Sequence, residues 1–174
     1  MKIVETVLPG VLIIQPKVHA DERGFFLETF QIERYREAGV TLPFVQDNHS
    51  RSTRGVLRGM HFQRTRPQGK LVWVSRGAVL DVAVDVDPAS PTFGRYSATL
   101  LDENNHHQHW IPPGYAHGFC TIGAVTDLHY KCTDLYRPDD EAGFVWNDPD
   151  VAIPWPVATP VLSHKDAALP RLRP

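Results

Sequence analysis

The sequence contains little cysteine, little net charge and no long hydrophobic run. Its 174 residues include two cysteines, Cys120 and Cys132, which is too few for a disulfide framework. We therefore expect two reduced thiols in a cytoplasmic protein. The net charge of −2 lacks the basic excess of most nucleic-acid-binding proteins. No apolar run reaches the ~18 residues of a membrane-spanning helix, and residues 1–10 do not resemble a secretory signal. Neither a nucleic-acid nor a membrane partner is expected.

Several common nucleotide-binding and nucleophile motifs are also missing. The chain has no P-loop, no Gly-x-Gly-x-x-Gly, no Gly-x-Ser-x-Gly and no Cys-x-x-Cys. A bound phosphate would therefore have to be held by arginine and lysine side chains.

Proline, by contrast, is abundant, at 15 residues. Because proline interrupts helices and central strands, we expect short elements joined by many loops. Residues 31–38 form the one clear helical pattern, and Gly39 follows as a common helix stop. Candidate strands are residues 10–16, 24–30, 70–75, 78–86, 94–101, 107–111, 119–121, 127–133 and 143–146. These short strands predict an all-β protein, a single two-sheet jelly roll over residues 1–174 with a C-terminal segment that wraps the body.

The predicted strand at residues 78–86 alternates between two kinds of side chain. Leu80, Val82 and Val84 share one face, and Asp81 and Asp85 share the other. The simplest interpretation is that both aspartates face water. If they face inward instead, they need partners, because a buried charge without one is costly.

Histidines gather at residues 106, 107 and 109. Three neighbouring imidazoles can hold zinc or iron. No cysteine or carboxylate stands beside them at a useful spacing. We therefore interpret them as a solvated strand end and expect no metal site there.

Three polar segments are candidates for a small-molecule site in the mouth of a barrel. They are residues 46–54, residues 58–63 followed by Lys70, and residues 112–119. The first segment is either a loop or a strand that lines the barrel. His61 and His117, each taken alone, are more typical of structural histidines than of catalytic ones.

Ten sequence blocks in order give these candidates a context. They are residues 21–28, 46–48, 57–61, 69–70, 81–85, 90–94, 112–119, 130–133, 146–149 and 162–166. In order and spacing they resemble the signature blocks of the dTDP-4-dehydrorhamnose 3,5-epimerase family, over about residues 7–170. The resemblance implies a cupin-type jelly roll with one or two short helices, a homodimer and no cofactor.

The cupin motifs bear on the question of a metal. Pro112-x-Gly114-x-x-His117 fits the second cupin motif. The first metal-binding cupin motif contains His-x-His, whereas this chain has His61-Phe62-Gln63. This departure argues against the usual cupin metal.

The family's substrate is dTDP-4-dehydro-6-deoxy-D-glucose, whose C3 and C5 protons lie alpha to the C4 ketone. By resemblance, His61 is the base and Asp166 its partner, which would hold the ring and stabilise the imidazolium. Tyr130 would return a proton from the far face, and Lys70 would stabilise the developing oxyanion at C4. Whether Asp81 or Asp85 helps to hold His61 or Lys70 is left open.

The resemblance also implies a set of binding residues. Arg58 and Lys165 would meet the diphosphate through charge-assisted hydrogen bonds. On the nucleotide, reached across the dimer, Phe26 would stack on thymine, Glu28 would accept from its N–H and Arg23 would pair with phosphate. Family binding positions are also occupied by Gln46, Asn48, His117, Tyr136 and Glu141.

Three other functions compete with a double epimerase. The first is an epimerase that inverts only C3 or only C5, since pocket shape decides which face reacts. The second is a metal-dependent cupin oxygenase or isomerase, and the third is a sugar-nucleotide-binding module without catalysis.

Two departures from the family pattern are His109, where an apolar residue is common, and Asp87. Neither is expected to touch a catalytic position.

Overall fold

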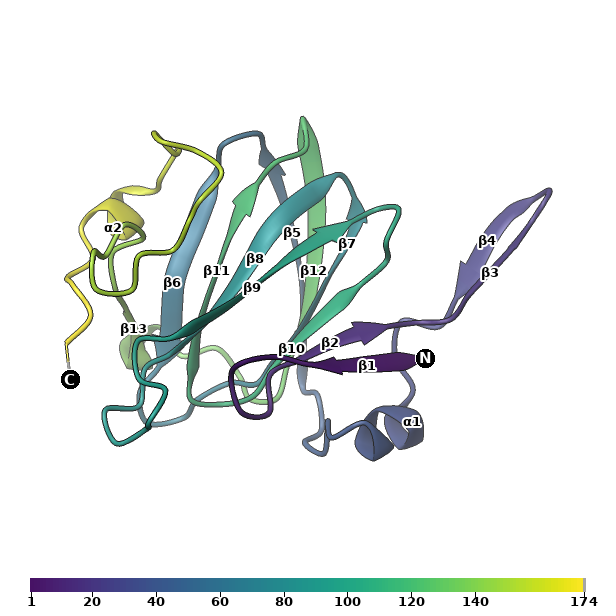
Figure 1. Cartoon of the computed structure of the whole chain (residues 1–174), viewed down its shortest axis with the longest axis horizontal. Helices are drawn as coiled ribbons and strands as arrows, with labels where there is room; N and C mark the ends of the chain where they lie inside the picture. Colours follow the sequence, from purple (N-terminus) through teal and green to yellow (C-terminus); the bar gives the residue numbers. More distant parts are fainter. Residues whose placement is uncertain (174) are drawn as a thin grey trace.

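The computed structural model describes residues 1–173 and consists mainly of two antiparallel sheets (Figure 1). The order of the six-stranded sheet is β1 (Lys2–Glu5), β2 (Leu12–Gln15), β10 (Gln108–Ile111), β7 (Lys70–Arg76), β12 (Val125–Cys132) and β5 (Gln46–Thr53). The order of the five-stranded sheet is β13 (Glu141–Gly143), β6 (Leu57–Gln63), β11 (Tyr115–Thr121), β8 (Ala78–Asp85) and β9 (Tyr96–Asp102). The predicted all-β jelly roll is confirmed.

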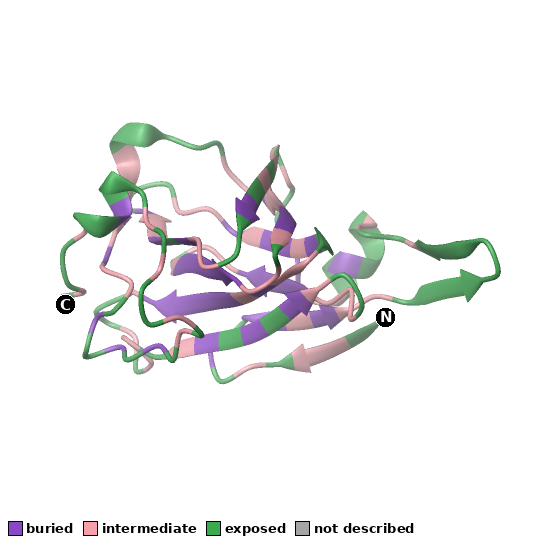
Figure 2. Ribbon diagram, turned by 90° about the horizontal axis from the view of Figure 1, so that it is seen from above, coloured by how far each residue is buried: buried purple, intermediate pink, exposed green. Residues whose placement is uncertain are grey.

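A core of aliphatic and aromatic side chains lies between the sheets. Val72 and Leu128 from the larger sheet pack with Val79, Ala83 and Phe119 from the smaller one, and all are buried. Figure 2 shows these central strands largely buried. Alternation along each strand therefore places one set of side chains in this layer.

A two-stranded hairpin projects from the body (Figures 1 and 2). It consists of β3 (Val18–Asp21) and β4 (Gly24–Leu27), which pair only with each other. Almost all of its residues are exposed, including Phe25 and Phe26. We call β3 and β4 the arm.

The helix predicted at residues 31–38 is confirmed as α1 (Ile32–Glu37). The Gln31 side chain caps it by accepting a hydrogen bond from the Arg34 backbone N–H, and Gly39 follows with φ of 101°. Buried Tyr35 donates a hydrogen bond of 2.6 Å to Gln108 Oε1 and so attaches the helix to β10.

A second helix, α2 (His164–Ala167), lies near the C-terminus, beside β6 (Figure 1). The side chain of Ser163 caps this turn by accepting a hydrogen bond of 3.0 Å from the Asp166 backbone N–H. Around α2, the C-terminal segment runs along the body: Val161 bridges to Val56, and the Val145 N–H bonds to the Pro170 carbonyl. The predicted wrapping segment is thus observed.

Some local predictions change in the structure. Of the two alternatives for residues 46–54, a loop or a strand, the strand is observed, as β5 over residues 46–53. The sequence pattern does not predict β1, β3 or β6. The first two have only four residues each, and β6 contains Gly59, which a strand pattern disfavours.

The interpretation that Asp81 and Asp85 face water is wrong, because both are buried. Asp81 is bonded by two histidines. Asp85 accepts hydrogen bonds from the hydroxyls of Ser90 and Thr92 in the following turn. These donors offset the cost of burying each carboxylate.

Two glycines allow β6 and β11 to approach closely. A Cβ on Gly118 would lie 2.8 Å from the Arg58 carbonyl oxygen and 2.5 Å from Met60 Sδ. Gly59 has φ of 116° and faces Gly118 across the pair. This contact lies beside the register pair His61 and His117.

Candidate active site

Two adjoining cavities, of about 220 and 260 Å³, open between the sheets. Both are lined by His61 from β6, Lys70 from β7 and Tyr130 from β12. His61 belongs to the smaller sheet, and the other two residues belong to the larger one. In a ligand that spans both cavities, the central atoms would therefore lie between His61 on one side and Lys70 and Tyr130 on the other.

His61 is held by a carboxylate from the C-terminal helix. Its Nε2–H donates a hydrogen bond of 2.6 Å to Asp166 Oδ1. Burial opposes ionisation of Asp166, but the hydrogen bond and charge of His61 together with Ser163 and Lys165 outweigh it and keep the pKa of this carboxyl below its usual value. Since Nε2 is engaged, Nδ1 is the ring nitrogen free to accept a proton.

A second carboxylate lies on the other side of the His61 ring. Glu141 Oε1 is 3.9 Å from His61 Nδ1. Glu141 Oε2 accepts hydrogen bonds from Lys165 and, at 2.5 Å, from the Tyr136 hydroxyl. Burial raises the pKa of Glu141, but these two donors together with the charges of His61 and Lys165 outweigh burial and hold it below the usual value. The same hydrogen bond to Glu141 is the main reason that the pKa of Tyr136 rises to about 12.

Lys70 and Tyr130 are both affected by burial. Burial lowers the pKa of the Lys70 ammonium, although the nearby Cys132, Asp81 and Glu141 oppose this change. Burial raises the pKa of the Tyr130 phenol, and Cys132 adds to the effect, while Arg58 opposes it. Tyr130 is therefore a protonated donor at neutral pH.

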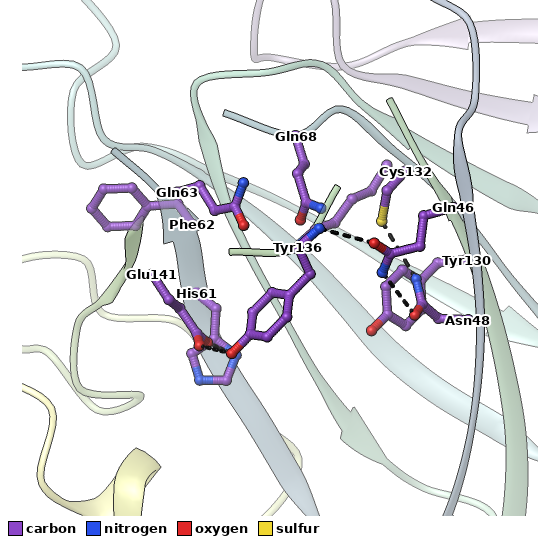
Figure 3. Close-up of a pocket in the computed structure, with 11 residues that line it drawn as sticks. Gln46, Asn48, His61, Phe62, Gln63, Gln68, Tyr130, Cys132, Tyr136 and Glu141 are labelled. Atoms are coloured by element: carbon purple, nitrogen blue, oxygen red, sulfur yellow. Dashed lines mark hydrogen bonds and ion pairs between the residues drawn. The ribbon is translucent and has the colours of Figure 1, made fainter. Parts of the chain in front are cut away.

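The first cavity carries amide and hydroxyl groups (Figure 3). Gln46 donates a hydrogen bond of 3.0 Å to Asn48 Oδ1 and accepts one of 2.9 Å from the Tyr136 backbone N–H. Tyr136 points toward Glu141, close to His61, in the same view. These groups suit a ligand with several hydroxyl and carbonyl oxygens.

The second cavity has a cationic side. Arg58, His117 and Lys165 line it together with Ser163 and Asp166. The guanidinium of Arg58 donates a hydrogen bond of 3.2 Å to Ser52 Oγ. An arginine and a lysine at one opening provide charge-assisted donors for a phosphate or a diphosphate.

His117 belongs to a buried cluster that the sequence interpretation missed. Its Nε2–H donates to Asp81 Oδ2, and the Nδ1–H of His109 donates to Asp81 Oδ1, both at 2.8 Å. The view of residues 107–109 as a solvated strand end is therefore wrong for His109, which is fully buried. A single carboxylate, that of Asp81, separates His109 from His117.

Three predicted binding residues lie outside both cavities. Arg23, Phe26 and Glu28 lie on or next to the arm, and within this chain the arm projects away from the body (Figure 1). Arg23 binds Asp21, and Glu28 accepts a hydrogen bond of 2.9 Å from Arg34. The remaining predicted residues line the two cavities, namely His61, Lys70, Tyr130, Asp166, Gln46, Asn48, Arg58, His117, Tyr136, Glu141 and Lys165.

Several lining residues were missed by the sequence interpretation. Gln63 and Cys132 stand two positions after His61 and Tyr130 on the same strands, so the period-two rule could have found both. Gln68 and Ser163 come from loops, where no periodic signal exists.

Among residues 1–173, no group of three or more histidine, cysteine, aspartate or glutamate side chains is arranged to hold a metal ion. No helix in this range is long and apolar enough to cross a membrane.

Comparisons with known proteins agree with this geometry. The family model for dTDP-4-dehydrorhamnose 3,5-epimerase matches residues 5–174. An enzyme of that name from Methanothermobacter thermautotrophicus is 47% identical, covering 95% of this chain and 91% of the relative. One from Neisseria gonorrhoeae is 50% identical over 97% of this chain, which spans 52% of that relative's length.

A solved structure extends the comparison to three dimensions. It is the dTDP-6-deoxy-D-glucose-3,5-epimerase of Legionella pneumophila in complex with dTDP-4-keto-L-rhamnose. Its TM-score is 0.95 at 50% identity, covering 98% of this chain and 92% of that chain. The protein is thus a jelly roll of the cupin class, and its cavity carries groups suited to proton transfer. The chain belongs to the dTDP-4-dehydrorhamnose 3,5-epimerase family, a family of isomerases.

Proposed function

We propose that this chain converts dTDP-4-dehydro-6-deoxy-D-glucose to dTDP-4-dehydro-L-rhamnose by inverting C3 and C5, a step in dTDP-L-rhamnose biosynthesis. The observation that carries the proposal is the position of His61. It lies on the smaller sheet, is bonded to Asp166 of α2, and faces Lys70 and Tyr130 on the larger sheet. The cationic side at Arg58 and Lys165 supports a diphosphate in the second cavity.

Each inversion consists of one proton removal and one proton return. His61 Nδ1 takes the proton from C3, and the electrons of that C–H bond form a C3–C4 double bond as the C4 oxygen becomes an enolate. The Lys70 ammonium stabilises this oxyanion. Tyr130 then gives its phenolic proton to the opposite face of C3, and the ketone re-forms. Proton exchange with water restores neutral His61 and Tyr130, and the same sequence follows at C5.

Both steps leave the oxidation state of the sugar unchanged. Proton loss and return therefore require no redox cofactor. A metal ion is not needed to polarise the ketone if Lys70 is at the C4 oxygen, because a fixed ammonium supplies the same charge.

We further propose that two copies of the chain form a homodimer in which the arm of one copy completes the site of the other. Arg23, Phe26 and Glu28 are not among the residues that line the two cavities of their own chain, and Phe26 is exposed. In a twofold dimer each arm could reach the partner's nucleotide, where Phe26 can stack on thymine, Arg23 can bind phosphate and Glu28 can accept from the base. The cytoplasmic location expected from the two reduced thiols stays a prediction.

Deuterium exchange tests the reaction directly. The protein is incubated with dTDP-4-dehydro-6-deoxy-D-glucose in D₂O, and the sugar is analysed by NMR and mass spectrometry. Deuterium at both C3 and C5, with inverted configuration, is the expected result. Deuterium at one carbon would instead identify a single-centre epimerase. No deuterium despite tight nucleotide binding would identify a binding module, and activity lost on chelation would identify a metal-dependent cupin.

A further inference from the structure

A buried histidine on the larger sheet is bonded to the same carboxylate as the cavity histidine. His109 on β10, Asp81 on β8 and His117 on β11 form a chain of two hydrogen bonds, each 2.8 Å long. His109 and Asp81 are fully buried, and His117 is 6% exposed. Because β10 belongs to one sheet and the other two strands to the second, this cluster joins the sheets directly behind the cavity.

The hydrogen bonds define the protonation of the cluster. Burial opposes ionisation of Asp81, but His117 and His109 together outweigh it and hold the pKa of this carboxyl well below its usual value. An ionised Asp81 can only accept hydrogen bonds, so His109 Nδ1 and His117 Nε2 both carry hydrogen. The ring nitrogen that His117 has left for a ligand is Nδ1.

His109 itself is suited to the neutral form. Its Nε2 is buried and has no hydrogen-bond partner among the described residues. A protonated ring would place an unsatisfied N–H and a positive charge at this atom, whereas a neutral ring leaves only a lone pair there. The geometry therefore favours the tautomer with hydrogen on Nδ1.

We propose that His109 is a positioning residue that occupies one oxygen of Asp81 and thereby keeps His117 neutral, with Nδ1 available to accept a hydrogen bond from a substrate hydroxyl. A carboxylate that already accepts one hydrogen bond stabilises an imidazolium less strongly than one that accepts none. The link to substrate rests on the proposed function, whereas the effect on His117 does not.

Some groups around His117 favour its protonated form, and others oppose it. Asp81 from β8 favours the imidazolium, while the ammonium of Lys70 from β7 opposes it. Burial opposes it most and brings the pKa of His117 below its ordinary value. The other neighbours are Tyr130 from β12 and His61, its register partner on β6, with the cations Arg58 and Lys165 lining the same cavity. Removing His109 leaves Asp81 with a single imidazole and so strengthens its attraction for a proton on His117.

The test follows individual histidine rings by NMR in protein labelled at histidine, without substrate. In His109→Leu the titration midpoint of His117 is expected to rise by about 0.5–1 pH unit. It is expected to return toward the original value in His109→Gln, whose amide can again donate to Asp81. An unchanged or lowered midpoint in folded His109→Leu would overturn the proposal. His107→Leu is the control and should leave the midpoint unchanged, because the His107 ring makes no hydrogen bond to Asp81.

The unmodified protein gives a second readout that does not depend on whether a variant folds. The nitrogen chemical shifts of His109 at pH 7 are expected to show hydrogen on Nδ1 and none on Nε2. A protonated Nε2 would contradict the proposal.

The pH profile of kcat/KM then tests the link to substrate. Its acidic limb is expected to move to higher pH in His109→Leu along with the His117 midpoint. A shifted midpoint with an unchanged profile would disprove the substrate link alone. A protein with no exchange activity would disprove the proposed function while the ring titration still decides the role of His109.

Discussion

The two carboxylates next to His61 differ in what they do for the ring. Asp166 accepts a short hydrogen bond from Nε2, so it determines which nitrogen carries hydrogen. Glu141 is 3.9 Å from Nδ1 and is already bonded to Tyr136 and Lys165. Glu141 can therefore stabilise an imidazolium by charge and still leave Nδ1 open to substrate, which makes His61 a suitable base.

Replacing Asp166 by asparagine should slow proton removal without preventing nucleotide binding. The amide cannot stabilise the imidazolium as a carboxylate does, and it can turn its NH₂ group toward Nε2 and change the tautomer. We expect deuterium exchange at C3 and C5 to fall by about 10²–10⁴-fold. Calorimetry with dTDP should show binding within a few-fold of the original. Exchange at the original rate in Asp166→Asn would mean that His61 needs no partner.

The buried histidines also predict how stability depends on pH. The pKa of His117 is lowered by burial, so the unfolded chain takes up a proton first as the pH falls. The stabilising contribution is present in full above the ordinary histidine pKa of ~6.5 and is lost as the pH falls toward the folded-state value. Burial lowers the pKa of His129 as well, so His129 also makes the folded protein less stable as the pH falls.

We therefore expect the urea midpoint of unfolding to be lower at pH 5.5 than at pH 7.5. The difference should be smaller in His117→Gln, which lacks this titration. A pH dependence as large in His117→Gln as in the unmodified protein would contradict the role of His117.

At the scale of elements, the close pair of β6 and β11 positions two histidines. Gly118 lies between His117 and Phe119 at an irregularity in the register, and any side chain there would meet the backbone of β6. The helix α2 acts in the same way from outside the sheet, because its cap at Ser163 holds the backbone of Asp166. The positions of His61, His117 and Asp166 thus depend on one close strand pair and one helical turn.

Gly118→Ala should destabilise the protein by about 1–3 kcal/mol, since the added methyl group cannot be accommodated without moving β6 or β11. Urea unfolding at pH 7.5 measures this change. Leu100→Ala on the exposed side of β9 is the control and should change stability by no more than about 0.5 kcal/mol. Equal stability of Gly118→Ala and the unmodified protein would mean that the two strands can separate at little cost.

At the scale of the whole molecule, the arm has few contacts within this chain that explain why it carries two phenylalanines. Phe25 contacts the ring of His106, and Phe26 is 70% exposed. Exposed aromatic side chains of this kind are typical of interaction surfaces. In the dimer that we propose, exchange of the arms covers them and brings Arg23 and Glu28 to the partner's cavities.

Mixing two inactive variants tests this arrangement. One variant carries His61→Ala, and the other carries Arg23→Ala with Phe26→Ala. If the arm serves the partner, a mixed dimer contains one complete site, so random co-assembly should restore about a quarter of the original activity. If the arm serves its own chain, no mixed dimer has a complete site and activity stays absent. Light scattering on each variant checks that dimers form.

Much of the fold could be predicted from local patterns. Alternation predicted most strands, and the helical pattern with Gly39 predicted α1. The weakly patterned β1, β3 and β6 could not be predicted, because their strand form depends on pairing with distant segments. The fourteen predicted site residues came from the resemblance, and eleven of them line the cavities while three lie on or next to the arm.

By itself the sequence determined the kinds of element, the positions of the turns and the set of chemical groups, since these depend on neighbouring residues. It also determined that Asp81 and Asp85 share a face of β8, because the strand period is two. Only the tertiary structure decided that this face is inside, that Asp166 meets His61 across 105 positions of chain, and that His109 meets Asp81. Packing of two sheets brings these residues together, and contacts between distant segments have no local signal.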